Sequence, residues 1–256
     1  MTGTLRVLEH NALVYRRTWR GSIFASFVSP MLFLAAIGLG LGTLVSRGSP
    51  QGVNGVSYLD FLAPGLLATA TMQTAFSETT YRLMARIRWS GTYDAMLATP
   101  LSVHDIRNGE LTWLALRLLL VAVLFFVAMV LFHTLHSATA ALAVPVAALN
   151  GLAFAAPMIA FTATQQTDTG FAVIGRFVIT PLFLLGGAFF PIDRLPSVIQ
   201  AIAWLTPLAH GVALTRGLSL GTIALPAGLL HLGVLVAYTA IGAVVAGIAL
   251  ERRLAR

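Results

Sequence analysis

The chain contains no cysteine and no lysine among its 256 residues. Without cysteine it can have neither a disulfide framework nor a cysteine metal site. Without lysine it cannot contain the G-x-x-x-x-G-K-[ST] phosphate-binding loop, so the chain has no P-loop of its own. We therefore expect neither a cofactor site nor catalytic residues in this sequence.

Charged residues are also scarce. They make up 10% of the chain, against about 25% in soluble domains, whereas 57% of the residues are hydrophobic and the mean hydropathy is +0.85. This composition predicts a membrane protein. The net charge of +7 comes from arginines spread along the chain rather than from one basic patch, so we expect no nucleic-acid partner.

The apolar residues gather in six runs, each close to the ~20 residues that cross a bilayer. These runs predict transmembrane helices at 22–45, 58–81, 111–132, 139–164, 171–190 and 224–250. Residues 4–20 separate apolar from charged side chains on a helical wheel, which predicts an amphipathic helix in the membrane interface. A signal peptide is the alternative, but no A-x-A-like cleavage site follows. We therefore expect an all-α polytopic membrane protein with a single domain over residues 1–256.

The arginines predict the orientation. If both termini lie inside, the inner segments hold 12 of the 16 arginines, and the outer segments hold only Arg47, Arg194 and Arg216. Positive charge concentrates on the cytoplasmic side of membrane proteins. We expect a multi-pass protein of the bacterial inner membrane, with both termini and residues 91–110 in the cytoplasm.

Residues 91–110 form the longest polar interruption of the chain. Thr92 can cap a short helix that ends before Pro100, because a residue that precedes proline disfavours the α region. Ser102 and Asp105 have the spacing of a capping box that opens the next helix. The short helix places three apolar side chains on one face: Tyr93, Met96 and Leu97. We expect this face to point away from the bilayer and to be bound by another protein.

Residues 191–222 predict two short re-entrant or interfacial helices on the outer side, because Pro196 and Pro207 cut them into apolar pieces of about ten residues. Within them, Gly217–Gly221 matches G-x-S-x-G and His210 lies nearby. A nucleophile elbow needs a strand before its serine, so we prefer a glycine-rich turn. An intramembrane serine hydrolase stays as a third hypothesis.

Four ionisable residues lie near the predicted inner ends of spans: Glu78, Arg82, Glu110 and Arg117. Such groups are usually paired or functional. Glu78 and Arg82 have i, i+4 spacing, so we favour a local ion pair and a structural role over a mechanistic one. The spans show no chain of carboxylates, which disfavours a stand-alone secondary carrier or channel, the second hypothesis. The six histidines include no H-E-x-x-H pair, and we expect no metal site.

Three separated motifs resemble the ABC-2 type permeases, and most closely the branch of the nodulation lipo-oligosaccharide and daunorubicin-resistance exporters. They occur in order over essentially the whole chain. The motifs are Tyr58–Gly65 (YLDFLAPG), Thr92–Leu101 (TYDAMLATPL), and Phe190–Pro196 (FPIDRLP) with Trp204–Val212 (WLTPLAHGV) and Arg216-Gly217.

The resemblance implies a type V ABC exporter-like subunit that moves an amphipathic or hydrophobic cargo outward. Two permeases, identical or homologous, would pair, and two copies of a separate ATP-binding subunit would bind ATP and Mg. Residues 4–20 would be the connecting helix and Thr92–Ala98 the coupling helix. The implied interface with the ATPase consists of Arg6, Glu9, Tyr93, Asp94, Met96, Leu97 and Pro100. The implied pathway and outer gate consist of Met72, Phe76, Phe183, Phe189 and Phe190.

Overall fold

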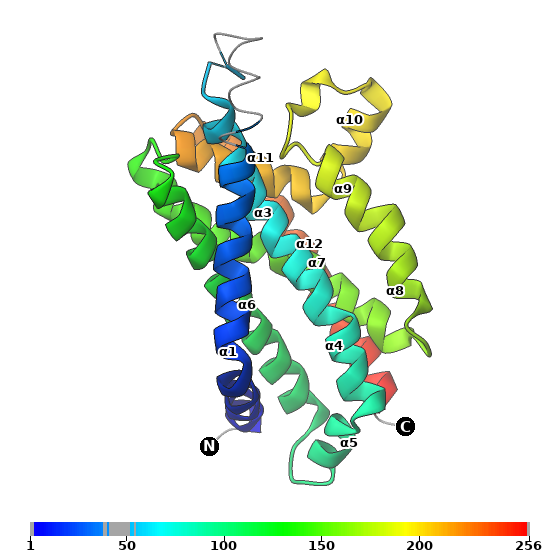
Figure 1. Ribbon diagram of the computed structural model, residues 1–256. Coiled ribbons are helices and arrows are strands. Elements are labelled where there is room, and N and C mark those ends of the chain that lie inside the picture. Colours follow the sequence, from blue (N-terminus) through cyan, green and yellow to red (C-terminus); the bar gives the residue numbers. More distant parts are fainter. Residues whose placement is uncertain (1–2, 38–39, 41–51, 54, 255–256) are drawn as a thin grey trace.

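The computed structural model describes residues 3–37, 40, 52–53 and 55–254, and Figure 1 shows their arrangement. These residues are largely helical and include one isolated bridge, between Val53 and Val56. The α-helices are α1 (Gly3–Ala36), α3 (Tyr58–Thr79), α4 (Tyr81–Met84), α5 (Thr92–Leu97), α6 (Val103–Leu131), α7 (Ala143–Thr164), α8 (Thr169–Ile174), α9 (Thr180–Leu185), α10 (Ser197–Trp204), α11 (Pro207–Leu220) and α12 (Leu225–Leu254). Short π or 3-10 turns cover Ala85–Trp89, Ala138–Leu142, Gly175–Ile179 and Ile192–Arg194.

Four described helices are long and apolar enough to cross a membrane: α1, α6, the stretch 138–164 that contains α7, and α12. The helices α10 and α11 are bent by 84° to each other and would make a fifth span if they were counted as one. The predicted span at 171–190 corresponds to the shorter helical stretch Thr169–Leu185. An all-helical membrane protein is therefore confirmed, whereas the number of six spans stays a prediction.

The first helix differs from the expectation of a separate interfacial helix. Residues 4–20 and the start of the span predicted at 22–45 form one continuous helix of 34 residues, α1. Gly21 at the expected junction does not end the helix, because an internal glycine costs only about 1 kcal/mol relative to alanine. Residues 38–39 and 41–45 of the predicted span lie outside the described residues.

The core is centred on α7, which contacts α3, α6, α11 and α12. Small residues let these helices approach closely, as is usual in membrane proteins. A Cβ on Gly151 would lie 2.8 Å from a methyl group of Leu118, and one on Gly242 would lie 2.7 Å from Pro157. Large apolar side chains on α12 and on 173–184 remain exposed, as expected of surfaces that face lipid or another subunit.

Both termini lie at the same end of the molecule as α5, and α10 lies at the opposite end (Figure 1). We call these the α5 end and the α10 end. Two contacts hold the α5 end together. Thr4 Oγ1 donates to Asp105 Oδ1 at 3.3 Å, and Arg107 Nη1 pairs with Glu251 Oε1 at 3.3 Å.

Candidate functional site

An open-sided cavity of about 370 Å³ lies between α1, α3, α6 and α9, and we call it the groove. It is lined by Ser26, Ser29, Pro30, Phe33, Leu66, Thr69, Ala70, Gln73, Thr74, Val121, Phe125 and Phe183. None of these side chains is charged, and five are polar: Ser26, Ser29, Thr69, Gln73 and Thr74. The groove can therefore offer hydroxyl and amide hydrogen bonds to a molecule that is otherwise held by apolar contact.

The wall that α3 gives to the groove follows one helical stripe. Leu66, Thr69, Ala70, Gln73 and Thr74 have i, i+3, i+4, i+7 and i+8 spacing, which places them on one face. The hydroxyl of Thr69 is already bonded to the carbonyl of Leu66 at 2.9 Å, so Gln73 is the larger hydrogen-bonding group available there. The polar members of this stripe, Thr69, Gln73 and Thr74, have helical spacing in the sequence, and this spacing could have predicted the groove.

Two residues expected along the pathway do not line the groove. Met72 is fully buried and packs in the core with Ala68 and Ala75, and Phe76 packs beside Gly175. Successive residues of an α-helix point about 100° apart, so Met72 lies off the stripe that contains Gln73. Met72 therefore lies in the core beside the groove, and its role as a pathway residue stays a prediction.

Aromatic rings cluster beside the groove. The ring of Phe189 lies edge-to-face against Phe183, with centroids 5.0 Å apart, and against Phe33 at 6.3 Å. Phe33 and Phe183 are both groove residues, so Phe189 bridges from α1 to α9. Phe190 is exposed and takes no part in these ring contacts. Phe33 was not anticipated, because nothing in the sequence pairs α1 with residue 189.

The helix α5 begins one residue differently from the prediction. Gly91, in the left-handed region at φ +58°, is the N-cap, and Thr92 is the first helical residue. The Thr92 hydroxyl instead lies 2.6 Å from Ser90 Oγ. The capping box before α6 is as predicted: Ser102 Oγ accepts from Asp105 N at 3.2 Å and Asp105 Oδ2 accepts from Ser102 N at 3.1 Å. These bonds from Ser102 lower the pKa of Asp105.

The apolar face of α5 points inward, so the expectation of an outward-facing Tyr93 is wrong. Tyr93 is only 1% exposed and belongs to the core cluster that contains Val7, Leu83 and Ile106. Met96 and Leu97 are half-buried against the same cluster. The face is buried within the chain because α1, α4 and α6 already cover it. The exposed residues of this segment are Asp94, Ala95, Ala98, Thr99 and Pro100.

A second open cavity, of about 450 Å³, lies between α1 and the α5 segment, and we call it the α5 hollow. It is lined by Arg6, Val7, His10, Ser90, Thr92, Ala95, Met96, Thr99 and Leu101. The structure therefore brings Arg6 and Met96, both expected at an interface, to one surface. Glu9 is exposed on α1 but does not line the hollow.

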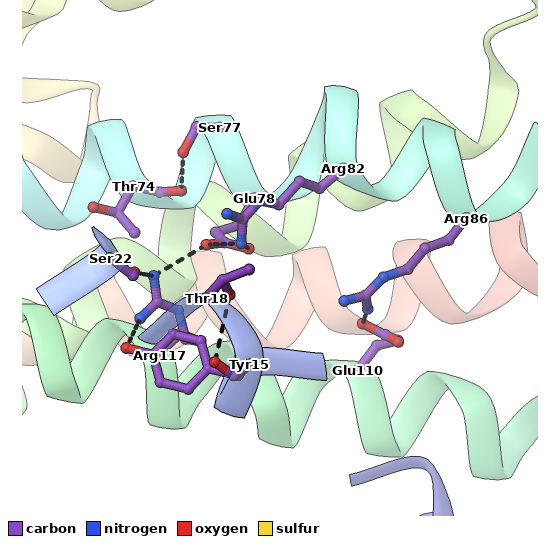
Figure 2. A network of polar contacts seen from close by, with 10 residues as sticks. All are labelled: Tyr15, Thr18, Ser22, Thr74, Ser77, Glu78, Arg82, Arg86, Glu110 and Arg117. Atoms are coloured by element: carbon purple, nitrogen blue, oxygen red, sulfur yellow. Dashed lines mark hydrogen bonds and ion pairs between the residues drawn. The ribbon is translucent and has the colours of Figure 1, made fainter. Parts of the chain in front are cut away.

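A polar network joins α1, α3 and α6 (Figure 2). The predicted Glu78–Arg82 pair is present at 2.8 Å. Glu78 Oε1 also lies 3.4 Å from Arg117 Nη2. Arg117 is buried and donates to Tyr15 Oη at 3.0 Å and to Ser22 Oγ at 2.9 Å, and its guanidinium lies 4.6 Å from the centre of the Tyr15 ring.

Glu110 forms a second pair beside this network, with Arg86. It also accepts a hydrogen bond from Asn11 Nδ2 at 3.1 Å. Burial is the largest single influence and lowers the pKa of Arg86, but Glu110 and Tyr93 together outweigh burial and raise this pKa. The partners from α1 were not predicted, although Asn11, Tyr15 and Ser22 lie on one helical face. All four charges near the membrane are thus paired: Arg82 locally with Glu78, and Glu78, Glu110 and Arg117 also across helices.

The G-x-S-x-G segment is not a nucleophile elbow. Ser219 is fully buried in the last turn of α11, so a helix rather than a strand precedes it. His210 lies nine residues earlier on the same helix, about 13 Å away at 1.5 Å per residue. Its ring nitrogens instead contact His231 Nδ1 at 2.8 Å and the carbonyl of Trp204 at 2.9 Å. Ser219 and His210 therefore cannot act as a catalytic pair.

Comparison with known proteins gives a consistent result. Residues 4–220 match the family described as ABC-2 type transporter. "Nodulation protein J" of Rhizobium leguminosarum bv. viciae is 38% identical over 98% of this chain and 95% of its own length, and that of Rhizobium meliloti (strain 1021) is 35% identical over 98% and 93%. "Inner membrane transport permease YadH" of Escherichia coli (strain K12) is 21% identical over 78% of this chain and 75% of its own.

Proposed function

The chain belongs to the ABC-2 type transporter family, whose members are permease subunits, and from this premise we propose that it is the membrane-spanning subunit of a bacterial exporter driven by ATP hydrolysis in a separate protein. The observation that carries the proposal is the groove. It runs between helices of a membrane domain, its lining contains no charge, and the ring of Phe189 packs against the lining residue Phe183.

The lining of the groove indicates the class of cargo. A charged ion would find no opposite charge along the lining, whereas Gln73, Ser26 and Ser29 can hydrogen-bond to hydroxyl or amide groups. Leu66, Val121 and the aromatic rings provide apolar contact for a tail. The cargo is therefore a neutral or weakly charged amphipathic molecule, such as a lipid-linked saccharide, a lipid or a polyketide-like drug, moved outward.

The α5 hollow supports a docking site for the ATP-binding subunit. Its walls come from α1 and from the α5 segment, and α1 is tied to α3 and α6 by the network around Arg117. A subunit bound in the hollow would therefore push on helices that also line the groove. On this account the complex contains two ATP-binding subunits and a second permease, identical or homologous, in the inner membrane. The α5 end and both termini face the cytoplasm.

The test is transport into inverted membrane vesicles that contain the chain and the ATP-binding protein encoded beside its gene, with a fluorescent lipid-linked saccharide as cargo. Accumulation should require ATP and both proteins. Gln73→Trp should block the groove and abolish accumulation, while Leu229→Trp, at an exposed position of α12 that does not line the groove, should not. Uptake that proceeds without ATP and without the partner would identify a carrier or channel instead.

A further inference from the structure

The segment that follows α9 is a strap of five non-helical residues, Gly186–Phe190. Gly187 has φ +87°, a conformation that side chains with a Cβ rarely adopt. The strap packs directly on α3, because a Cβ on Gly65 would lie 2.8 Å from Ala188 Cα. Since α9 ends at Leu185, carbonyls of the strap have no helical donor and need partners from elsewhere.

Those partners come from two other helices. Arg216 of α11 donates from Nη2 to the carbonyls of Gly187 at 2.8 Å and Ala188 at 3.2 Å. Tyr58 of α3 donates from Oη to the carbonyl of Phe189 at 3.3 Å. The strap is therefore fixed at three successive carbonyls, and the last of them belongs to Phe189, whose ring packs against Phe33 and Phe183.

Arg216 has no carboxylate partner in this chain. All nine acidic residues lie within the described part of the sequence, and none forms an ion pair with Arg216. Its guanidinium instead lies 3.6 Å from the centre of the Phe61 ring, and Nε donates to the carbonyl of Phe61 at 2.9 Å. A half-buried cation without a counter-ion is costly, which points to a role beyond packing.

We propose that Arg216 is the positioning residue of the aromatic closure: it holds the strap against α3, and the strap holds the Phe189 ring between Phe33 and Phe183. This role rests on the proposed function, in which the groove is the cargo path. When the bonds from Arg216 to the strap are lost, Phe189 leaves its place and water enters the groove from the α10 end.

A single engineered thiol measures this opening directly, because the chain has no cysteine of its own. Thr69→Cys places the thiol inside the groove, where residue 69 is only 1% exposed. A membrane-impermeant thiosulfonate reacts with it only when water reaches it. The reagent is applied to spheroplasts and, separately, to inverted vesicles of the full complex, so that the side from which labelling occurs is determined in the same experiment.

Arg216→Gln should raise the labelling rate of the Thr69→Cys thiol from the α10 side by about tenfold or more, as expected for the loss of hydrogen bonds to a charged group. Arg216→Lys keeps the charge but lacks the planar guanidinium group that donates to several carbonyls at once. It should give a smaller rise in the labelling rate. Tyr58→Phe, which removes one neutral hydrogen bond, should raise the rate about threefold. Arg194→Gln, at an exposed arginine four residues after the strap, is the matched control and should leave the labelling rate unchanged.

Unchanged labelling in Arg216→Gln, with normal membrane insertion, would overturn the proposal. If that variant fails to insert, Arg216→Lys and Tyr58→Phe decide in its place, and unchanged labelling in both would overturn the proposal equally. A rise in labelling confined to inverted vesicles would leave the strap mechanism intact but contradict the orientation in the proposed function. The proposal for Arg216 and the proposed function can therefore be refuted independently.

Discussion

Tyr93 offers the sharpest test of how the α5 segment is held. The helix has only six residues, and Tyr93 is its one fully buried large side chain. Tyr93→Ala removes an aromatic ring from a packed core, which costs about 3–5 kcal/mol. Tyr93→Phe keeps the ring and removes only a buried hydroxyl that faces the Arg86–Glu110 pair, so it should cost far less than Tyr93→Ala.

Trypsin provides the assay, because the chain has no lysine and trypsin can cut only at arginines. Arg88 and Arg107 flank the α5 segment, and no arginine lies between them. A loss of about 3 kcal/mol should raise the population of the locally open form, and with it cleavage at Arg88, by about a hundredfold. Tyr93→Phe, which keeps the ring in the core, is the matched control and should be cut far more slowly than Tyr93→Ala. If Tyr93→Ala is cut no faster than the wild type, Tyr93 does not anchor α5.

Tyr93 also predicts an alkaline effect. Burial, and then the nearby Glu110 carboxylate, raise the pKa of Tyr93 well above 10. A raised folded pKa contributes stability below the unfolded value of about 10, and this stability is lost as the pH rises through the folded pKa. Tyr93 should therefore ionise only well above pH 10, and Tyr93→Phe should lose that late step from the tyrosinate absorbance titration.

Three further predictions concern helix contacts. Glu78→Gln leaves the buried Arg117 without its carboxylate and should lower stability by about 3 kcal/mol, whereas adding Arg117→Met should recover part of this loss in a double-mutant cycle followed by thermal unfolding in nanodiscs. Phe189→Ala should increase cargo leak per transporter with little change in expression, and the reverse result would leave only a packing role. Gly211→Ala would place a Cβ 2.3 Å from Asn150 Oδ1 and should reduce folded protein on gel filtration, while a normal profile would show that α7 and α11 can separate.

Local patterns located the elements well, because each depends on residues close in sequence. The capping box at Ser102, the pair Glu78–Arg82 and the two short helices cut by Pro196 and Pro207 are all present. Local patterns do not predict which surface an apolar helix face packs against. An amphipathic helix must cover its apolar face, but the sequence does not say whether the cover is the same chain or another protein, and Tyr93 is covered by its own chain.

Contacts between distant segments could not be predicted from one sequence. Nothing local to Arg117 indicates Tyr15 and Ser22 of α1 as partners, and nothing local to Arg216 indicates the carbonyls of Gly187 and Ala188. Such contacts depend on how the helices pack, and the tertiary context decides which of several apolar faces meet. The resemblance to ABC-2 permeases set the class of protein correctly, but it did not supply these partners.

The central claim is that an ATP-binding subunit docks at the α5 end, and co-purification measures it most directly. Ala95 is exposed, lines the α5 hollow and lies outside the buried core, so Ala95→Arg should leave the fold intact. Thr167→Arg, at an exposed position in the loop between α7 and α8, adds the same charge away from the hollow and serves as the control.

The loss of an interface anchor costs about 2 kcal/mol or more, which corresponds to roughly thirtyfold weaker binding. The account predicts that the wild type and Thr167→Arg retain the ATP-binding subunit and vanadate-sensitive ATP hydrolysis, and that Ala95→Arg loses both. An Ala95→Arg protein that retains its ATPase at the wild-type level, or a wild-type chain that hydrolyses ATP alone, would contradict it.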